Sequence, residues 1–159
     1  MKRFILVPIL TVFLLFLVAC APAQKDPSTD TSTAVSGNVL LDNTDLARTD
    51  SQGAITIKIS PFNLDDPGDT LKFDVVMDTH SIDLSMDLTI LAALTTDTGL
   101  SLRPTLWDGP MGGHHVEGTL SFPTTQNGKS ILEGTKQLTL TISNVDNVTR
   151  VFEWDLSGK

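Results

Sequence analysis

Residues 71–77 read LKFDVVM, and this stretch decides the fold class. Leucine, phenylalanine, valine and methionine stand at every second position, with lysine, aspartate and a further valine between them. In an extended chain successive side chains point to opposite faces, so the four large apolar residues lie on one face. A helix would instead repeat its apolar residues every three or four positions. The stretch therefore predicts a β-strand with one face in a hydrophobic core.

The same alternation recurs between residues 54 and 156, interrupted by clusters of Gly, Pro, Asn and Asp that favour turns. Besides LKFDVVM, the predicted strands are AITIKISPF (54–62), IDLSMDLTI (82–90), LSLRPTLW (100–107), VEGTLSF (116–122), QLTLTIS (137–143) and RVFEWDL (150–156). Only LTILAAL (88–94) has a composition suited to a short helix. These segments predict an all-β fold, a single antiparallel β-sandwich of the immunoglobulin or fibronectin-III type over residues 37–159.

The inward phase of the predicted strands identifies the expected core. Its members are Phe73, Val75, Leu84, Leu88, Leu120, Leu140, Ile142, Phe152 and Trp154. A chain of this length can enclose one hydrophobic core, so we expect one domain.

The N-terminus has the composition of a secretory signal. Lys2 and Arg3 precede an apolar run at 4–18, which is shorter than a membrane-spanning helix needs. We therefore predict a signal peptide over residues 1–19. Residues 20–36, rich in Ser, Thr, Pro and Asp, cannot bury enough surface to order themselves, and they predict a flexible linker.

Cys20 is the only cysteine in the 159-residue chain, so it forms no intramolecular disulfide. It ends the sequence LVAC (17–20), which resembles the lipobox of bacterial lipoproteins. The resemblance implies cleavage before Cys20, acylation (palmitate among the chains) and anchoring of the protein to a membrane on the extracytoplasmic side. Ala21 stands where an inner-membrane retention signal has aspartate, which favours the outer membrane of the cell envelope if the host has one.

The charge balance excludes one class of partner. Loss of Lys2 and Arg3 with the signal peptide reduces the 11 basic residues to 9 against 19 acidic ones, a net charge of −10. Nucleic-acid binding needs a basic face, so we expect no nucleic-acid partner. For the same reason we expect membrane attachment to depend on the lipid at Cys20 rather than on charge.

All three histidines lie in two short segments, MDTHS (77–81) and WDGPMGGHH (107–115), and each segment contains Met-x-x-His. Loops at the end of a sandwich often carry binding groups, so we expect the two segments to meet there. Imidazole with thioether sulfur favours copper, and imidazole alone also suits zinc. The candidate metal ligands are His80, His114, His115, Met77 and Met111.

Two other interpretations of these segments stay open. The histidines are also explained by turn and core chemistry alone, in a structural or protein-docking module of the cell envelope without a metal, or by an organic or protein ligand. THSIDL together with WDGPMGGHHVEGTLSFP resembles a group of small extracytoplasmic domains of bacteria and archaea, often lipid-anchored. The resemblance implies that Thr79, Ser81, Asp83 and Trp107 are further binding positions. No nucleophile elbow or phosphate-binding glycine loop is present in the sequence, so we expect no enzyme.

Overall fold

The computed structural model describes residues 46–158, which fold almost entirely into antiparallel strands. The elements are β1 (Arg48–Asp50), β2 (Ile55–Pro61), β3 (Thr70–Thr79), α1 (Leu88–Leu91), β4 (Ala92–Thr96), β5 (Ser101–Leu102), β6 (Leu106–Asp108), β7 (His115–Pro123), β8 (Thr125–Gln126), β9 (Lys129–Ser130), β10 (Gln137–Val145) and β11 (Val148–Asp155). Within the described residues no helix has the length and apolarity to cross a membrane. The predicted signal peptide, Cys20 and the linker lie outside the described part.

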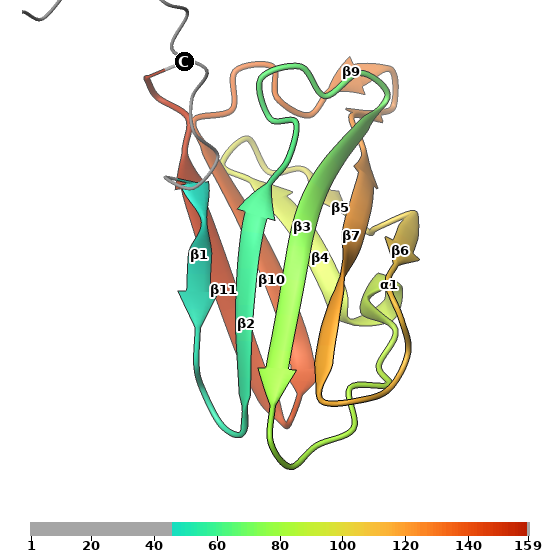
Figure 1. Cartoon of the computed structure of the whole chain (residues 1–159). Coiled ribbons are helices and arrows are strands. Elements are labelled where there is room, and N and C mark those ends of the chain that lie inside the picture. Colours follow the sequence, from blue (N-terminus) through green and yellow to red (C-terminus); the bar gives the residue numbers. More distant parts are fainter. Residues whose placement is uncertain (1–45, 159) are drawn as a thin grey trace, which may run out of the picture. The chain divides into compact units, whose positions relative to one another are not determined.

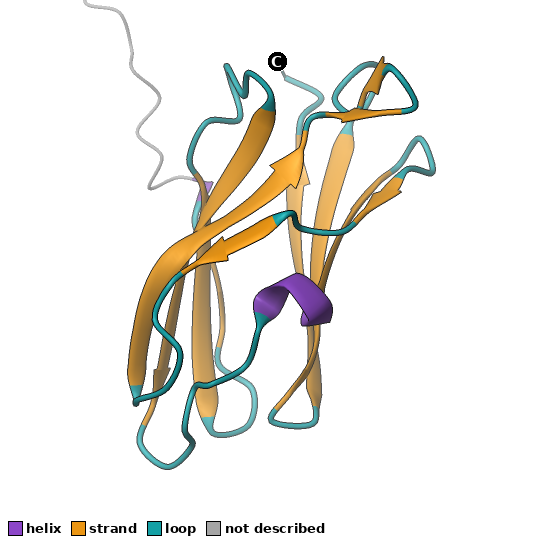
Figure 2. Cartoon of the chain, turned by 90° about the vertical axis from the view of Figure 1, so that its right-hand side faces the viewer, coloured by secondary structure: helices purple, strands orange, loops and turns teal. Residues whose placement is uncertain are grey.

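The strands form two facing sheets, which confirms the all-β sandwich (Figures 1 and 2). One sheet has the order β1-β2-β3-β7-β6 and the other β11-β10-β4-β5, while β8 and β9 form a separate small hairpin. Without β1 and β5, the orders β2-β3-β7-β6 and β4-β10-β11 follow the ABED and CFG arrangement of an immunoglobulin constant-type sandwich. The chain therefore crosses between the sheets after β3, β5 and β7.

The core lies between the sheets and contains every residue that the alternation predicts for it. Trp154 is fully buried beside Phe73, with ring centroids 5.3 Å apart, and its indole Nε1 donates to the carbonyl of Leu46 at 2.6 Å. Phe73 also meets the edge of Phe122 at 5.7 Å. The inward-facing apolar residues that alternate along β2, β3, β7, β10 and β11 thus form one apolar layer between the sheets.

The predicted strand at 82–90 is wrong. Residues 82–87 have no regular structure, and residues 88–91 form the single turn α1. Asp87 caps this turn, because its carboxylate accepts a hydrogen bond from the Thr89 backbone N–H at 2.8 Å. Leu84 and Leu88 are both buried as the segment crosses between the sheets. These two leucines are four residues apart, a spacing that an alternating strand also produces, and this is why the sequence pattern resembled a strand.

The predicted strand at 100–107 is two strands in different sheets. β5 pairs with β4 at Leu94–Leu102, whereas Trp107 in β6 pairs with Leu120 in β7. Pro104 stands between them and has no N–H to continue a ladder. The break lets the chain pass from one sheet to the other.

One end of the sandwich is joined by a buried arginine. Arg150 of β11 is fully buried, and its guanidinium donates to the carbonyls of Val145, Gln52 and Ile55 at 2.7, 2.5 and 3.2 Å. Its Nε also lies 3.2 Å from the carboxylate of Asp50. Because these partners lie in the β1–β2 connection or at the ends of β1, β2 and β10, Arg150 of β11 links the two sheets.

Candidate functional site

The two histidine-bearing segments meet at one end of the sandwich, as the sequence predicts. Thr79, the last residue of β3, donates its N–H to the carbonyl of His114 at 2.9 Å. Leu84 donates its N–H to the carbonyl of Gly113 at 2.9 Å and accepts from the N–H of Gly112 at 3.0 Å. The connection that follows β3 and the connection between β6 and β7 are therefore joined through their backbones.

Asp83 holds the glycine pair of this junction. Its carboxylate accepts the N–H of Gly113 at 2.6 Å. Gly112 and Gly113 have φ of +100° and +96°, a region that residues with a Cβ rarely adopt. Asp83, predicted as a binding residue, thus has a structural contact that fixes the loop carrying the histidines.

His115 pairs with Asp78 on the outer face of the five-stranded sheet. The two residues are opposite each other in the β3–β7 register, and Nδ1 of His115 lies 2.5 Å from the carboxylate of Asp78. The side chains are 62% and 54% exposed. The hydrogen bond that His115 makes to the carboxylate of Asp78, the negative charge of Asp78 and, less strongly, the charge of Glu117 raise the pKa of His115 above its ordinary 6.5. The carboxylate thereby orients the ring through Nδ1.

The remaining loop candidates differ in their contacts. His80 and Ser81 are exposed, as is Met111 in the glycine-rich loop. Thr79 is buried, and its hydroxyl donates to the carbonyl of Ala54 at 2.8 Å and accepts from the N–H of Ser81 at 3.3 Å. Thr79 therefore ties β3 to the start of β2 and does not point toward a ligand.

Met77 and Trp107 face inward, away from the other candidates. Met77 pairs with Val116 on the core side of the five-stranded sheet, whereas His115, which immediately precedes Val116, is on the outer side. Trp107 is half-buried, and its ring closes over Gly118. A site that used both Met77 and His115 would draw on opposite faces of one sheet.

Among residues 46–158, no three His, Cys, Asp or Glu side chains are placed together to hold a metal ion. The predicted ligands are thus divided between the core, the exposed loop and the outer sheet face. The histidine segments meet, but the described side chains do not converge on one point.

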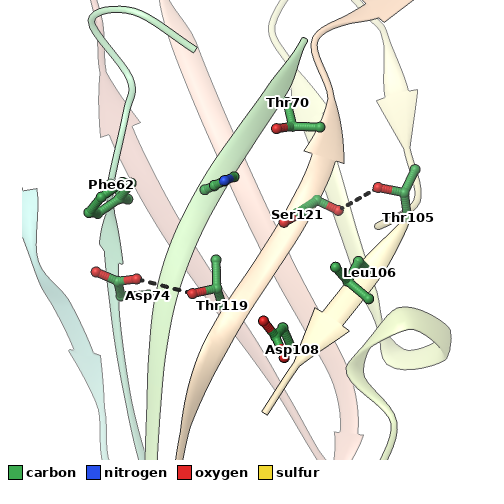
Figure 3. Close-up of a pocket in the computed structure, with 9 residues that line it drawn as sticks. Phe62, Thr70, Asp74, Thr105, Leu106, Asp108, Thr119 and Ser121 are labelled. Carbon is green, nitrogen blue, oxygen red and sulfur yellow. Dashed lines mark hydrogen bonds between the residues drawn. The ribbon is translucent and has the colours of Figure 1, made fainter. Parts of the chain in front are cut away.

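A second candidate site, which the sequence did not indicate, is a groove of about 520 Å³ on the outer face of the five-stranded sheet (Figure 3). Phe62 borders it on one side and Leu106 on the other, and these side chains are 57% and 53% exposed. The floor is polar and comes from β3, β7 and β6. The lining residues are Phe62, Thr70, Lys72, Asp74, Thr105, Leu106, Asp108, Thr119 and Ser121.

The strands fix the backbone of the groove while its side chains stay weakly bonded to one another. Thr119 donates to the carboxylate of Asp74 at 3.5 Å, and the hydroxyl of Thr105 donates to the carbonyl of Ser121 at 3.3 Å. Ordinary O–H···O bonds measure about 2.5–3.0 Å, so these are long. The hydroxyls and the carboxylate therefore retain capacity to bind a ligand.

Phe62 is held at the border of the groove by its backbone. Its N–H donates to the carbonyl of Lys72 at 2.8 Å, and the N–H of Lys72 donates to the side chain of Asn63 at 2.8 Å. Asn63 in turn donates to the carbonyls of Pro67 and Thr70. The turn after β2 is therefore locked to β3, which fixes the backbone that carries the phenyl ring at the border of the groove.

Comparison with known proteins gives a likeness in structure but none in family or curated sequence. No protein-family model matches the chain, and no curated protein matches it either. The crystal structure of a DUF4426 family protein from Pseudomonas aeruginosa is similar with a TM-score of 0.42 and 12% sequence identity, over 68% of this chain and 93% of that chain.

Proposed function

We propose that this protein is a membrane-anchored extracytoplasmic binding module that holds its ligand in the groove of the five-stranded sheet. The observation that carries the proposal is the composition of the groove. Two exposed apolar side chains, Phe62 and Leu106, border a floor of hydroxyl and carboxylate groups on paired strands. Binding sites for small ligands commonly combine apolar walls with a few positioned polar groups, in volumes of roughly 300–1,000 Å³.

The function proposed is binding, not catalysis. Asp74 and Asp108 are exposed carboxylates on neighbouring parts of the sheet, and the one hydroxyl that donates to Asp74, that of Thr119, does so at 3.5 Å, longer than the contact of an activated hydroxyl nucleophile with its base. The proposal of binding also rests on the sequence, which contains no nucleophile elbow. We propose a cell-envelope ligand or protein as the partner.

The test of binding uses three classes of probe on the isotope-labelled full chain: neutral oligosaccharides, short extended peptides and soluble lipid headgroups. Amide resonances are recorded in two-dimensional NMR spectra during each titration. We expect at least one class to shift resonances of Thr119 and Ser121 on the groove floor and not those of Thr139 and Thr141 on the opposite sheet. If no class shifts the floor selectively, the groove is not a binding site.

The proposed anchor is Cys20, on the strength of LVAC at the end of a basic and apolar N-terminus. Cells supplied with labelled palmitate should transfer the label to the wild-type protein but not to Cys20→Ser. A Ser36→Ala variant, changed in the predicted linker, serves as the control and should be labelled normally. Label that persists in Cys20→Ser would refute the anchor.

A metal function is the second candidate, and one contact favours it. Asp78 hydrogen-bonds Nδ1 of His115, as carboxylates commonly do beside metal-binding histidines, where they orient the ring and raise its basicity. His114 precedes it, and Met111 is exposed in the same loop. Copper is the metal we would expect, with zinc as the alternative.

The metal is tested by titrating the full chain with Cu(I), Cu(II) and Zn(II) while the fluorescence of the two tryptophans is recorded. Binding in the micromolar range should be lost in His114→Ala and His115→Ala. Met77→Leu is the matched control, because a buried methionine should not contribute. Binding that is indifferent to both histidine variants would remove this candidate.

A further inference from the structure

We infer that the ligand of the groove is an uncharged oligosaccharide. This inference rests on the proposed function and names the ligand class of the same site. It follows from three properties of the groove: its apolar borders, its polar floor and its charge.

The apolar borders suit the face of a sugar ring. Pyranose rings present axial C–H groups on one face, and such C–H groups pack against the electron-rich face of an aromatic ring. Phe62 supplies that ring, and its backbone bond to Lys72 fixes its place beside the floor. Leu106, on the other side of the groove, offers a second apolar contact (Figure 3).

The floor matches the hydroxyl groups of a sugar, each of which both donates and accepts. Thr105, Thr119 and Ser121 provide hydroxyls with the same dual capacity, while Asp74 and Asp108 accept only. Hydrogen bonds that a sugar hydroxyl donates to a carboxylate are charge-assisted and therefore stronger than neutral ones. The long bonds at 3.5 Å and 3.3 Å within the floor leave these groups able to exchange partners.

The charge of the groove selects against anionic ligands. Asp74 and Asp108 face one cation, Lys72, so the lining carries a small negative excess. The chain as a whole is also acidic, with a formal net charge of −8. Sulfated, phosphorylated or uronate-rich chains would meet repulsion, whereas uncharged hexoses and N-acetylated hexosamines would not.

An extended peptide fits the groove less well. Peptides usually bind sheets by adding a strand to an exposed edge, where backbone groups supply the affinity. The groove instead lies on the face of the sheet, and its floor is made by side chains of paired strands. Side-chain hydroxyls and carboxylates therefore have to recognise the ligand.

The experiment titrates the full chain, solubilised in a detergent without a sugar headgroup, with cellotriose, chitotriose and trigalacturonate. The heat of binding is measured by calorimetry, and the chemical shifts of the backbone amides are measured by NMR in a parallel titration. We expect both neutral trimers to bind with shifts on the groove floor, and the acidic trimer to bind at least about tenfold more weakly. Maltoside detergents should compete with the neutral trimers.

Variants locate the binding. Phe62→Ala and Asp108→Asn should each weaken trimer binding by about tenfold, the size expected when a side chain that contacts the ligand directly is changed. Val151→Ala, an exposed apolar change on the opposite sheet, and Glu117→Gln, a carboxylate change on β7 outside the groove, are the matched controls and should leave it unchanged. Melting curves show whether each variant is folded, and the wild-type shifts report the site independently of any variant.

The outcomes separate the inference from the proposed function. Neutral trimers that do not bind, or that bind equally well to both groove variants, would overturn the inference. Should peptides shift the groove floor while sugars do not, the binding function stands and the sugar assignment falls. Should no probe shift the floor, both fall.

Discussion

Two acid–base pairs lie at the same end of this sandwich, and they differ in their exposure to solvent. Asp50 and Arg150 join the two sheets, with the arginine side chain fully buried. Asp78 and His115 lie on the outer face of one sheet, each more than half exposed. Water screens an exposed pair strongly, whereas a buried charge depends on its protein partners. The first pair therefore serves stability, and the second is available to a ligand or a proton.

Removal of the buried arginine should have the largest effect of any change considered. Arg150→Ala leaves the carbonyls of Val145, Gln52 and Ile55 without their donor and leaves Asp50 without its positively charged partner. Breaking a buried pair in this way costs about 3–5 kcal/mol. Urea denaturation followed by tryptophan fluorescence measures the change in the free energy of unfolding.

The matched control is Arg103→Ala. Arg103 is exposed and donates to the carbonyls of Ile90 and Ala92, so its loss should cost no more than about 1 kcal/mol. Equal losses in the two variants would show that burial does not distinguish the arginines, and the contrast between the pairs would have no basis.

Acid provides an independent check of the same pair. Burial alone would raise the pKa of Asp50, but hydrogen bonds from Gln52 and then the charge of Arg150 outweigh it and lower the pKa below its ordinary 3.8. The stability that this carboxylate contributes is therefore present above that ordinary pKa of 3.8 and is lost as the pH falls through the lowered pKa. Asp50→Asn should remove that part of the acid sensitivity.

The sequence contained the information for the buried arginine, although its significance was missed. In RVFEWDL, Arg150 has the same phase as Phe152 and Trp154, so alternation places it inside. A single inward arginine predicts carbonyl and carboxylate partners, but only the register and the turns identify them. The three histidines were predicted as metal ligands because they are rare and clustered. Of these three, only His115 has a side-chain hydrogen-bond partner among the described contacts.

An apolar core residue provides the scale for the buried pair. Leu140 lies in the middle of β10, between Leu94 and Phe152 in the paired register. Leu140→Ala should cost about 2–5 kcal/mol because it removes buried methyl groups and leaves a cavity. Val151→Ala, on the outer face one strand away, is the control and should change the free energy of unfolding little. If both substitutions cost the same, the inward phase of β10 is misassigned.

The groove could not be found from the sequence because its residues lie on the solvent phase of three strands. Asp74, Thr119 and Ser121 are ordinary polar positions in an alternating pattern, and the pairing of β3 with β7 is a long-range contact. The sequence pattern also gave no sign of β6 as a separate strand, because residues 100–107 were predicted as one strand, whereas the chain breaks at Pro104. Phe62 was the one local signal, because in AITIKISPF it has the opposite phase to Ile57 and Ile59, and alternation therefore places this large aromatic on the solvent side.

A close backbone approach occurs at Gly118 of β7, beside the end of β6. A Cβ added there would stand 2.6 Å from the carbonyl of Asp108 and from the Cα of Gly109, and 2.8 Å from the ring of Trp107. Because two of these neighbours are backbone, Gly118→Ala should cost about 1–3 kcal/mol. Gly158→Ala, which meets nothing within 4 Å, is the control. A neutral Gly118→Ala would mean that the loop leading to the histidines yields easily.

The smallest effect should come from the exposed pair, and its sign distinguishes it from the buried one. Asp78 raises the pKa of His115 above 6.5, so the folded protein binds this proton more tightly than the unfolded chain does. The contribution to stability is therefore fully present below pH about 6.5 and is lost as the pH rises through the raised pKa. Asp50 loses its contribution in acid, whereas His115 loses its contribution toward alkaline pH.

NMR titration of the imidazole resonances should give a lower pKa for His115 in Asp78→Asn. Asp74→Asn, a carboxylate change further along the same face of β3, should change that pKa less. An unchanged pKa in Asp78→Asn would mean that the ring is not oriented by this carboxylate, and the support for a metal at His115 would be lost with it.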